Sequence, residues 1–530
     1  MISRIRDRVS DRPAEAESER RPPLLPRLRA GLTKPVDSAG LAIVRMGVGS
    51  MIAWEVWREI DSELLWTDYI EPVYHFRWSL FEWVHPLPGV WIFVAFGILA
   101  AAGLLVAIGL FYRVAAAVMF LGITYYFLLD QARYLNHRYL ACLLAFLLIL
   151  MPAHASYSID ARRTPWVRTR TMPAWPLWLM RLQVGIPYFF GGIAKLNFDW
   201  LVRTEPLATW LRERMDFPVI GRFFADDIFI RLLAWGSTAL DLFVVFLLLY
   251  KRTRAIGYAL AVMFHFMNSR LFNIGIFPWT MILVTTIFFE PDWPRRMGAA
   301  LRRGRAAVRV VIGAAFLVGF FIGGFLPLTF SAIRALIGGF GVAVAVFHLM
   351  PERLREEAAV AQVRRAEPSP WRRFTFSRRL AWFLAIWTGV QLLVPFRHFV
   401  IPGNAHWTEE GNRFSWHMLL RQKRGEVAFI VTDPATGHTG AAEEVDELLT
   451  AYQRWKMEQT PDMIVQFAHH LEDYYREVHG FGDLEIRLDS IQSLNGRIPQ
   501  KYIDPDVDLT EIPIPYWPPG RWIVPLEPYE

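Results

Sequence analysis

Residues 91–111 read Trp91-Ile-Phe-Val-Ala-Phe-Gly-Ile-Leu-Ala-Ala-Ala-Gly-Leu-Leu-Val-Ala-Ile-Gly-Leu-Phe111, a run without one charged side chain. A helix of about 20 residues rises about 30 Å, the thickness of the hydrocarbon core of a bilayer. This run predicts a membrane-spanning helix. Similar runs recur and predict a polytopic α-helical membrane bundle of about eleven spans, within a range of about nine to eleven. The predicted spans lie near residues 41–59, 91–111, 114–129, 137–152, 177–196, 232–250, 255–267, 273–289, 307–325, 330–349 and 380–396.

The composition also favours a membrane protein. Of 530 residues, 54% are hydrophobic and only 20% are charged, with a formal net charge of +7; soluble domains carry about 25% charged residues. A positive charge can indicate nucleic-acid binding, but here Lys and Arg cluster in short loops between apolar runs, so we expect no nucleic-acid partner. The one cysteine, Cys142, excludes an intrachain disulfide and a cysteine-based metal centre.

Charge divides the predicted loops into two sets. The first loop of one set, residues 59–82, is acidic, whereas the other set is rich in Arg. The positive-inside rule places the Arg-rich set and the N-terminus in the cytoplasm, and an odd number of spans places the C-terminal part outside. We predict a disordered basic cytoplasmic tail over 1–37, a transmembrane domain over 38–396 and an extracytoplasmic domain over 397–530. The Arg-rich segments are 1–37, 162–170, 251–254, 295–305 and 351–379.

The C-terminal part has the patterns of a small α+β or β-rich domain. An extended run, Glu426–Asp433, precedes turn residues and two amphipathic stretches at 442–455 and 461–478. A second strand-like run, Leu484–Leu494, ends at Asn495-Gly496, a common turn dipeptide. The Pro-rich end from Pro513 predicts an extended strap.

Lys195 is the first candidate for chemistry. It lies in Tyr188-Phe-Phe-Gly-Gly-Ile-Ala-Lys-Leu-Asn-Phe-Asp-Trp200, at the end of a predicted span. Ionisable groups within a bilayer are costly and are functional candidates for that reason. A buried neutral amine can act as a general base. The alternative is a lysine that extends from a helix end to water. Gly191 and Gly192 allow a helix or a flat ligand to approach closely.

Two further segments place polar groups at the membrane boundary. His137 follows Asn136 at the start of a span and can shuttle a proton, or it is a hydrogen-bonded structural histidine. Asn136 can cap that helix. His265 and Asn268 lie in a stretch, Phe264–Pro278, that interrupts an apolar region. Such interruptions line cavities in membrane proteins, but a simple surface loop is the alternative.

Six segments taken together resemble the vitamin K-dependent γ-glutamyl carboxylases and their bacterial relatives, which contain an HTTM membrane domain. The resemblance runs from Leu41 to about Leu509, in the same order as in that family. The segments are Asn136-His-Arg-Tyr-Leu140, Tyr188–Trp200, Phe264–Pro278, Gln391-Leu-Leu-Val-Pro-Phe-Arg-His398, Trp407-Thr-Glu-Glu-Gly-Asn-Arg-Phe-Ser-Trp416, and Ser493–Arg497 with Ile503–Asp508. Against the animal enzyme, the spans at 307–349 look like an insertion.

The resemblance implies an enzyme and a reaction. Lys195 matches the base that deprotonates vitamin K hydroquinone (or menaquinol), and reaction with O2 leads through an alkoxide to the epoxide. The alkoxide removes a glutamate γ-proton, and CO2 adds to the carbanion. His137 matches a histidine that assists carboxylation, and no metal is implied. The residues implied to bind substrate are Asn136, His265, Asn268, His398, Trp407 and Trp416.

The implied setting is the lipid bilayer of a bacterial inner membrane. A prenylated quinol partitions into lipid, and an apolar pocket excludes water from a reactive base. A glutamate-containing extracytoplasmic protein is the implied second substrate. Three other functions remain open on the sequence: a quinol epoxidase without carboxylation, a structural membrane component with an external interaction domain, and a membrane transporter or lipid-handling protein on the same scaffold. For the transporter, Lys195 and the interruption near Asn268 would bind an anionic substrate.

Overall fold

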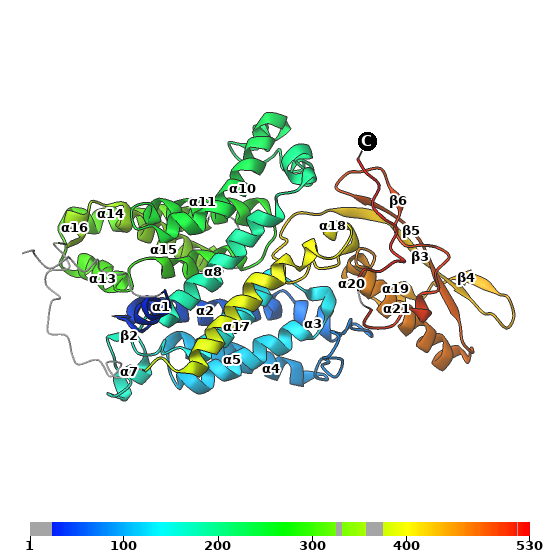
Figure 1. The fold of residues 1–530 in the computed structure, drawn as a ribbon, viewed down its shortest axis with the longest axis horizontal. Helices are drawn as coiled ribbons and strands as arrows, with labels where there is room; N and C mark the ends of the chain where they lie inside the picture. The colour runs from blue at the N-terminus through cyan, green and yellow to red at the C-terminus, as the bar shows by residue number, and fades with distance from the viewer. Residues whose placement is uncertain (1–23, 325–330, 357–374, 517, 530) are drawn as a thin grey trace, which may run out of the picture.

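A helical bundle carries a mixed domain at one end (Figure 1). The structure, a computed structural model, describes residues 24–324, 331–356, 375–516 and 518–529. The prediction of a helical bundle followed by a domain with strands is confirmed at this level.

Each predicted span falls on a helix. Six helices among the described residues are long and apolar enough to cross a membrane: α2, α4, α10, α14, α15 and α17. The others are shorter, interrupted or more polar, so the number eleven stays a prediction. The helices are α2 (Ala39–Asp61), α4 (Val90–Ile108), α5 (Tyr112–Leu128), α6 (Asn136–Leu150), α8 (Trp175–Ala194), α10 (Asp227–Leu249), α11 (Arg254–Leu271), α12 (Phe277–Val284) continued by η4 (Thr285–Phe288), α14 (Ala306–Gly324), α15 (Ser331–Leu349) and α17 (Arg378–Leu393).

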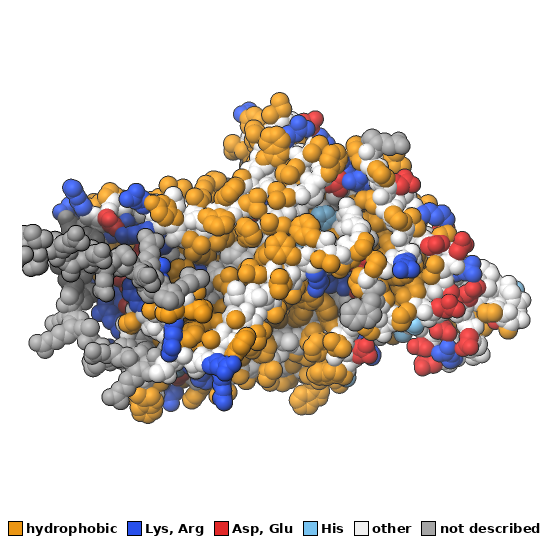
Figure 2. All heavy atoms as spheres, in the orientation of Figure 1, with side chains coloured by type: hydrophobic (Ala, Val, Ile, Leu, Met, Phe, Trp, Pro, Cys, Tyr) orange, Lys and Arg blue, Asp and Glu red, His pale blue; other side chains and the backbone are white. Residues whose placement is uncertain are grey.

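The basic loops meet at the end of the bundle far from the mixed domain. Asp37 accepts hydrogen bonds from Arg295 at 3.0 Å and from Arg170 at 3.4 Å, and Ser38 lies 2.6 Å from Ser156. Figure 2 shows Lys and Arg gathered at this end, Asp and Glu over the mixed domain, and apolar surface between them.

The predicted disorder over 1–37 needs correction for its second half. Residues 24–37 form α1 (Leu24–Thr33) and strand β1 (Pro35–Asp37), and β1 pairs antiparallel with β2 (Thr171–Pro173). This strand pairing and the Asp37 ion pairs order a stretch whose composition alone indicates a tail. Residues 1–23 of the predicted tail lie outside the described residues.

A four-stranded antiparallel sheet of order β4-β3-β5-β6 forms the C-terminal domain, with α21 (Pro461–Tyr474) packed on one face. Alternate residues of β5 are buried, from Ile486 to Leu494, and Phe467 of α21 packs against Phe429. The strands are β3 (Lys423–Thr432), β4 (Thr439–Ala441), β5 (Glu485–Leu494) and β6 (Gln500–Lys501).

The predicted helix over 442–455 is two helices, α19 (Val445–Leu448) and α20 (Ala451–Met457). Thr450 and Gln453 form a capping box, which starts a new helix in the middle of the amphipathic pattern.

The core of the C-terminal domain includes side chains from loops of the bundle. Phe76 and Ala132 belong to its hydrophobic cluster. Gln453 donates to Tyr74 O and to Asp130 Oδ2, both at 2.8 Å. The domain therefore rests on the loops 62–89 and 129–135, at the same end of the bundle as Lys195 and His137.

Candidate functional site

Lys195 immediately follows α8, and its charge is buried and paired. Its Nζ lies 2.6 Å from Asp241 Oδ2 on α10, and the two residues are 7% and 5% exposed. The ammonium therefore points to a carboxylate inside the bundle and not to water. A buried charge is tolerated when it is paired in this way.

Aromatic rings and two glycines surround this ion pair. Nζ lies 5.3 Å from the ring centre of Trp200 and 5.5 Å from that of Phe264, within the range of cation–π attraction. A Cβ on Gly192 would lie 2.7 Å from the backbone nitrogen of Leu242, so α8 and α10 meet backbone to backbone here. The expected close approach of a helix is therefore observed at Gly192.

His137 lies in a second buried charge cluster, on α6 against α2. Its Nε2 is 3.5 Å from Glu55 Oε1, and Glu55 also pairs with Arg58 at 3.0 Å and with Arg138 at 3.5 Å. A Cβ on Gly275 would lie 3.4 Å from His137 Cε1. Gly275 has a φ of +59°, a conformation that favours glycine, so the chain turns directly over the imidazole.

The segment 416–418 of the C-terminal domain joins the two clusters. Asn136 Nδ2 donates to the carbonyl of His417 at 3.2 Å. On the other side, a Cβ on Gly191 would lie 3.3 Å from Met418 Cε, 3.8 Å from Asp241 Oδ2 and 4.0 Å from the Trp416 carbonyl oxygen. The neighbours of Lys195 and of His137, which lie in different predicted spans, therefore contact one segment.

His265 and Asn268 lie on α11, and the interruption comes after them. His265 Nε2 is 2.8 Å from the Tyr188 hydroxyl, which also lies 3.0 Å from Thr285 Oγ1. Asn268 is half-buried, and none of its side-chain atoms forms a hydrogen bond with the described residues. The helix breaks at 272–276, where Gly275 contacts His137.

Three of the expected substrate-binding residues differ in their surroundings. His398 packs on His417, with ring centres 4.5 Å apart, and Trp416 is fully buried against Tyr139, at 5.2 Å. Trp407 is fully buried in the C-terminal core, and its Nε1 donates to Val524 O at 2.7 Å. Trp407 thus belongs to the packing of that domain, whereas His398 and Trp416 border the segment 416–418.

Asp199 connects the loop after Lys195 to the C-terminal domain. Its Oδ1 lies 2.5 Å from Arg497 Nη2 and 3.1 Å from Arg203 Nη1, and its Oδ2 accepts from Asn495 Nδ2 at 3.0 Å. Asn495 and Arg497 belong to the turn after β5, so two distant sequence segments meet here.

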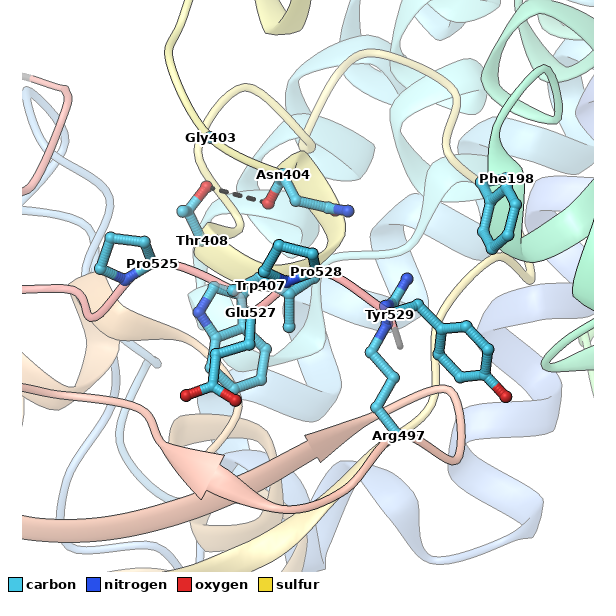
Figure 3. Close-up of a pocket in the computed structure, with 11 residues that line it drawn as sticks. Phe198, Gly403, Asn404, Trp407, Thr408, Arg497, Pro525, Glu527, Pro528 and Tyr529 are labelled. Atoms are coloured by element: carbon cyan, nitrogen blue, oxygen red, sulfur yellow. Dashed lines mark hydrogen bonds between the residues drawn. The ribbon is translucent and has the colours of Figure 1, made fainter.

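Two cavities lie where the C-terminal domain meets the bundle. One, of about 470 Å³, is lined by Phe198, Trp407, Arg497 and the strap up to Tyr529. In Figure 3, Arg497 and Tyr529 lie together below Phe198. The other, of about 370 Å³, is lined by Trp78, Arg397, Arg413 and Phe414, among others. Neither cavity is lined by Lys195 or His137. Near Lys195, Met418 occupies the space over Gly191.

Comparison with known families matches both parts of this arrangement. A family model of the HTTM domain matches residues 33–293, and one of the lumenal domain of vitamin K-dependent gamma-carboxylase matches residues 377–528. The chain belongs to the vitamin K-dependent gamma-carboxylase family. This confirms the family predicted from the six segments. Membership in this carboxylase family implies an enzyme that uses vitamin K hydroquinone. No solved structure matches the chain.

The two matches leave residues 294–376 between them, and α14 and α15 lie in this interval. Within this pair, α15 packs on α11 and α12, and α14 packs on α15. Lys195, His137 and Asn136 lie within the HTTM match of this carboxylase-family chain, and His398 and Trp416 lie within the lumenal-domain match.

Sequence reasoning missed the partners of both proposed catalytic residues. Asp241 is the one carboxylate in the predicted span 232–250, and Glu55 lies inside the span 41–59. Each is an acidic residue within a predicted span, which by itself indicates a functional candidate. The sequence therefore shows that these two acidic residues are candidates, but it does not show that they pair with Lys195 and His137.

Proposed function

We propose that this chain is a vitamin K-dependent carboxylase in which Lys195 starts the oxygenation of the hydroquinone to its epoxide, coupled to carboxylation of glutamate side chains. The observation that carries the proposal is the buried Lys195–Asp241 pair, which lies inside the bundle and directly under the segment 416–418 of the lumenal-type domain. A strong base is useful only where water is excluded, and this position is enclosed.

The surroundings of Lys195 fit a flat aromatic quinol. Trp200 and Phe264 offer ring faces near Nζ, and Gly191 presents no side chain toward Asp241. Met418 covers Gly191, and a methionine side chain changes shape easily, so its displacement is the simplest way to make room for a ring. The substrates are then vitamin K hydroquinone or menaquinol from the bilayer, with O2 and CO2.

His137 is proposed to serve the carboxylation half of the reaction. Its hydrogen bond with Glu55 fixes the orientation of the imidazole, and Gly275 lies against Cε1 and Nε2 of the ring. A histidine oriented by a carboxylate is suited to proton transfer. Asn136 anchors the segment 416–418 beside it.

The proposed setting is a bacterial inner membrane with the N-terminus in the cytoplasm. The Lys and Arg side chains at the end opposite the C-terminal domain support this orientation (Figure 2). The C-terminal domain then lies outside, where it meets a glutamate-containing protein substrate.

The test is quinone epoxide formation by the purified protein in nanodiscs, with chemically reduced vitamin K and oxygen. Lys195→Ala should lower the rate by about a hundredfold or more, which is within the contribution of a general base. Lys251→Ala is the matched control, because Lys251 is an exposed lysine paired with Glu352 at the basic end. A glutamate peptide and labelled bicarbonate in the same reaction report carboxylation.

The outcomes separate the alternatives. Epoxide without label in the peptide indicates an epoxidase that lacks carboxylation. No epoxide from folded wild-type protein with several vitamin K homologues contradicts the proposal. In that case a transporter or lipid-handling protein becomes the better explanation, because intramembrane charges also bind transported substrates.

A further inference from the structure

Asp241 makes the closest polar contact of Lys195. It is carried by α10, one helical turn beyond Thr238, and its carboxylate is enclosed by α8 and by the segment 416–418. The 2.6 Å separation is that of a strong, charge-assisted hydrogen bond.

The described groups around this pair offer no second acidic partner. Tyr188 of α8 and His265 of α11 hydrogen-bond to each other, and the Tyr188 hydroxyl is shared with Thr285. Trp200 and Phe264 present rings to Nζ. Among the described residues, Asp241 is the one carboxylate within ion-pair distance of Lys195.

This geometry poses a problem for a lysine base. A lysine in an ion pair already carries its proton, and an ammonium has no lone pair with which to take another. Lys195 can accept a proton from a quinol hydroxyl only if its own proton leaves at the same time. Asp241 Oδ2 is the acceptor that the structure places within reach.

We infer that Asp241 is the positioning and proton-accepting partner through which Lys195 acts as the base; this inference rests on the proposed function. The O–H bond of the quinol breaks and an N–H bond forms at Lys195 Nζ. The proton that Nζ held toward Asp241 moves to Oδ2 and forms the O–H bond of a carboxylic acid. The products are a quinol monoanion, a lysine ammonium and a neutral Asp241.

The charges balance at every stage. Before transfer, the ammonium and the carboxylate sum to zero beside a neutral quinol. Afterwards, the ammonium faces the quinol monoanion and Asp241 is neutral, so the sum is again zero. Charge separation in an enclosed apolar site is expensive, and the pair avoids it by placing the positive charge next to the new negative charge.

The test isolates this one step by excluding oxygen. Protein in nanodiscs is mixed anaerobically with phylloquinol, and ultraviolet absorbance reports the quinol monoanion. Infrared difference spectra report the carbonyl band of a protonated carboxyl, and ¹³C-labelled aspartate distinguishes Asp from Glu. We expect wild type to gain both signals together. Asp241→Asn should lose the carboxyl band and slow epoxide formation about a hundredfold.

Two further variants separate proton transfer from folding. Asp241→Glu keeps a carboxylate and should restore both signals and at least a tenth of the wild-type rate. Glu290→Gln removes a carboxylate from another ion pair of the bundle, with Arg254, and should behave like wild type. If Asp241→Asn does not fold, two other observations still test whether residue 241 takes up the proton. They are the aspartate-specific band in wild type and its replacement by a glutamate band in Asp241→Glu.

Each result has one meaning. Monoanion in wild type and Asp241→Asn alike, with no aspartate band, overturns the inference but leaves Lys195 as the base. Neither monoanion nor epoxide from folded wild type overturns the proposed function, and with it the role of Asp241. The monoanion and the aspartate band, observed together, support both the proposed function and the role of Asp241.

Discussion

At the scale of single residues, we expect three histidines where the C-terminal domain joins the bundle to make the protein sensitive to acid. His406 Nε2 and His417 Nδ1 are 2.9 Å apart, and such a bond needs one ring to accept and therefore to be neutral. Burial lowers the pKa of His406 to about 3, with Arg421 and His398 adding to the effect. Burial, with His406 and His398 beside it, also holds the pKa of His417 well below its usual value.

The sign of the effect on stability follows from these pKa values. The unfolded chain takes up protons on these rings below about pH 6.5, and the folded chain does so only near pH 3 for His406. Stability is therefore complete above pH 6.5 and is lost as the pH falls. For one such ring the loss from pH 7 to 5 is about 2 kcal/mol. Thermal unfolding of the C-terminal domain in detergent, followed at both pH values, measures it.

His406→Gln provides the comparison, since glutamine offers polar atoms to His417 without titrating. The variant should lose less stability between pH 7 and 5 than wild type does. An equal loss in both would show that other groups cause the acid sensitivity.

At the scale of elements, the contact between α8 and α10 determines whether Lys195 meets Asp241. A Cβ on Gly192 would come within 2.7 Å of Leu242 N and 2.8 Å of its Cγ, and backbone does not yield as a flexible side chain does. Gly192→Ala should therefore push α10 away and destabilise the bundle by about 1–3 kcal/mol, as overpacking does. The measurement is the midpoint of thermal unfolding in nanodiscs.

The neighbouring glycine is the matched control for stability. A Cβ on Gly191 would first meet Met418 Cε at 3.3 Å, the far end of a flexible side chain. Gly191→Ala should leave the unfolding midpoint close to that of wild type. Because alanine favours a helix more than glycine does, equal destabilisation by both substitutions would contradict the idea that the contact with α10 determines the cost.

The elements themselves were largely predictable. Hydropathy placed a helix near 91–111, where α4 occupies Val90–Ile108, because apolar length alone decides such a segment. The amphipathic pattern over 442–455 predicted one helix, although Thr450 and Gln453 already carried the capping signal that divides it. Lys195 and His137 were found as intramembrane ionisable groups. Their carboxylate partners were missed, because periodicity identifies a face of a helix and not the helix that it meets.

At the scale of the whole molecule, the candidate site is complete only when the C-terminal domain is seated on the bundle. Its segment 416–418 contacts the surroundings of both Lys195 and His137. The Asp199 contacts with Arg203, Asn495 and Arg497 hold the two parts together beside that segment. These distant segments of the sequence thus come together only through this attachment.

Removing the charge of Asp199 should loosen the attachment without altering either core. In Asp199→Asn, Arg203 and Arg497 remain nearly buried without their carboxylate, a loss of about 3–5 kcal/mol for buried pairs. Arg424→Gln is the matched control, because Arg424 also bridges the two parts, to Glu213, but both side chains are more than half exposed. We expect limited proteolysis to release the C-terminal domain of Asp199→Asn faster than that of wild type, with epoxide formation lost in parallel, and Arg424→Gln to match wild type. If Asp199→Asn resists protease yet loses epoxide formation, the carboxylate acts on the site itself and not through the seating of the domain.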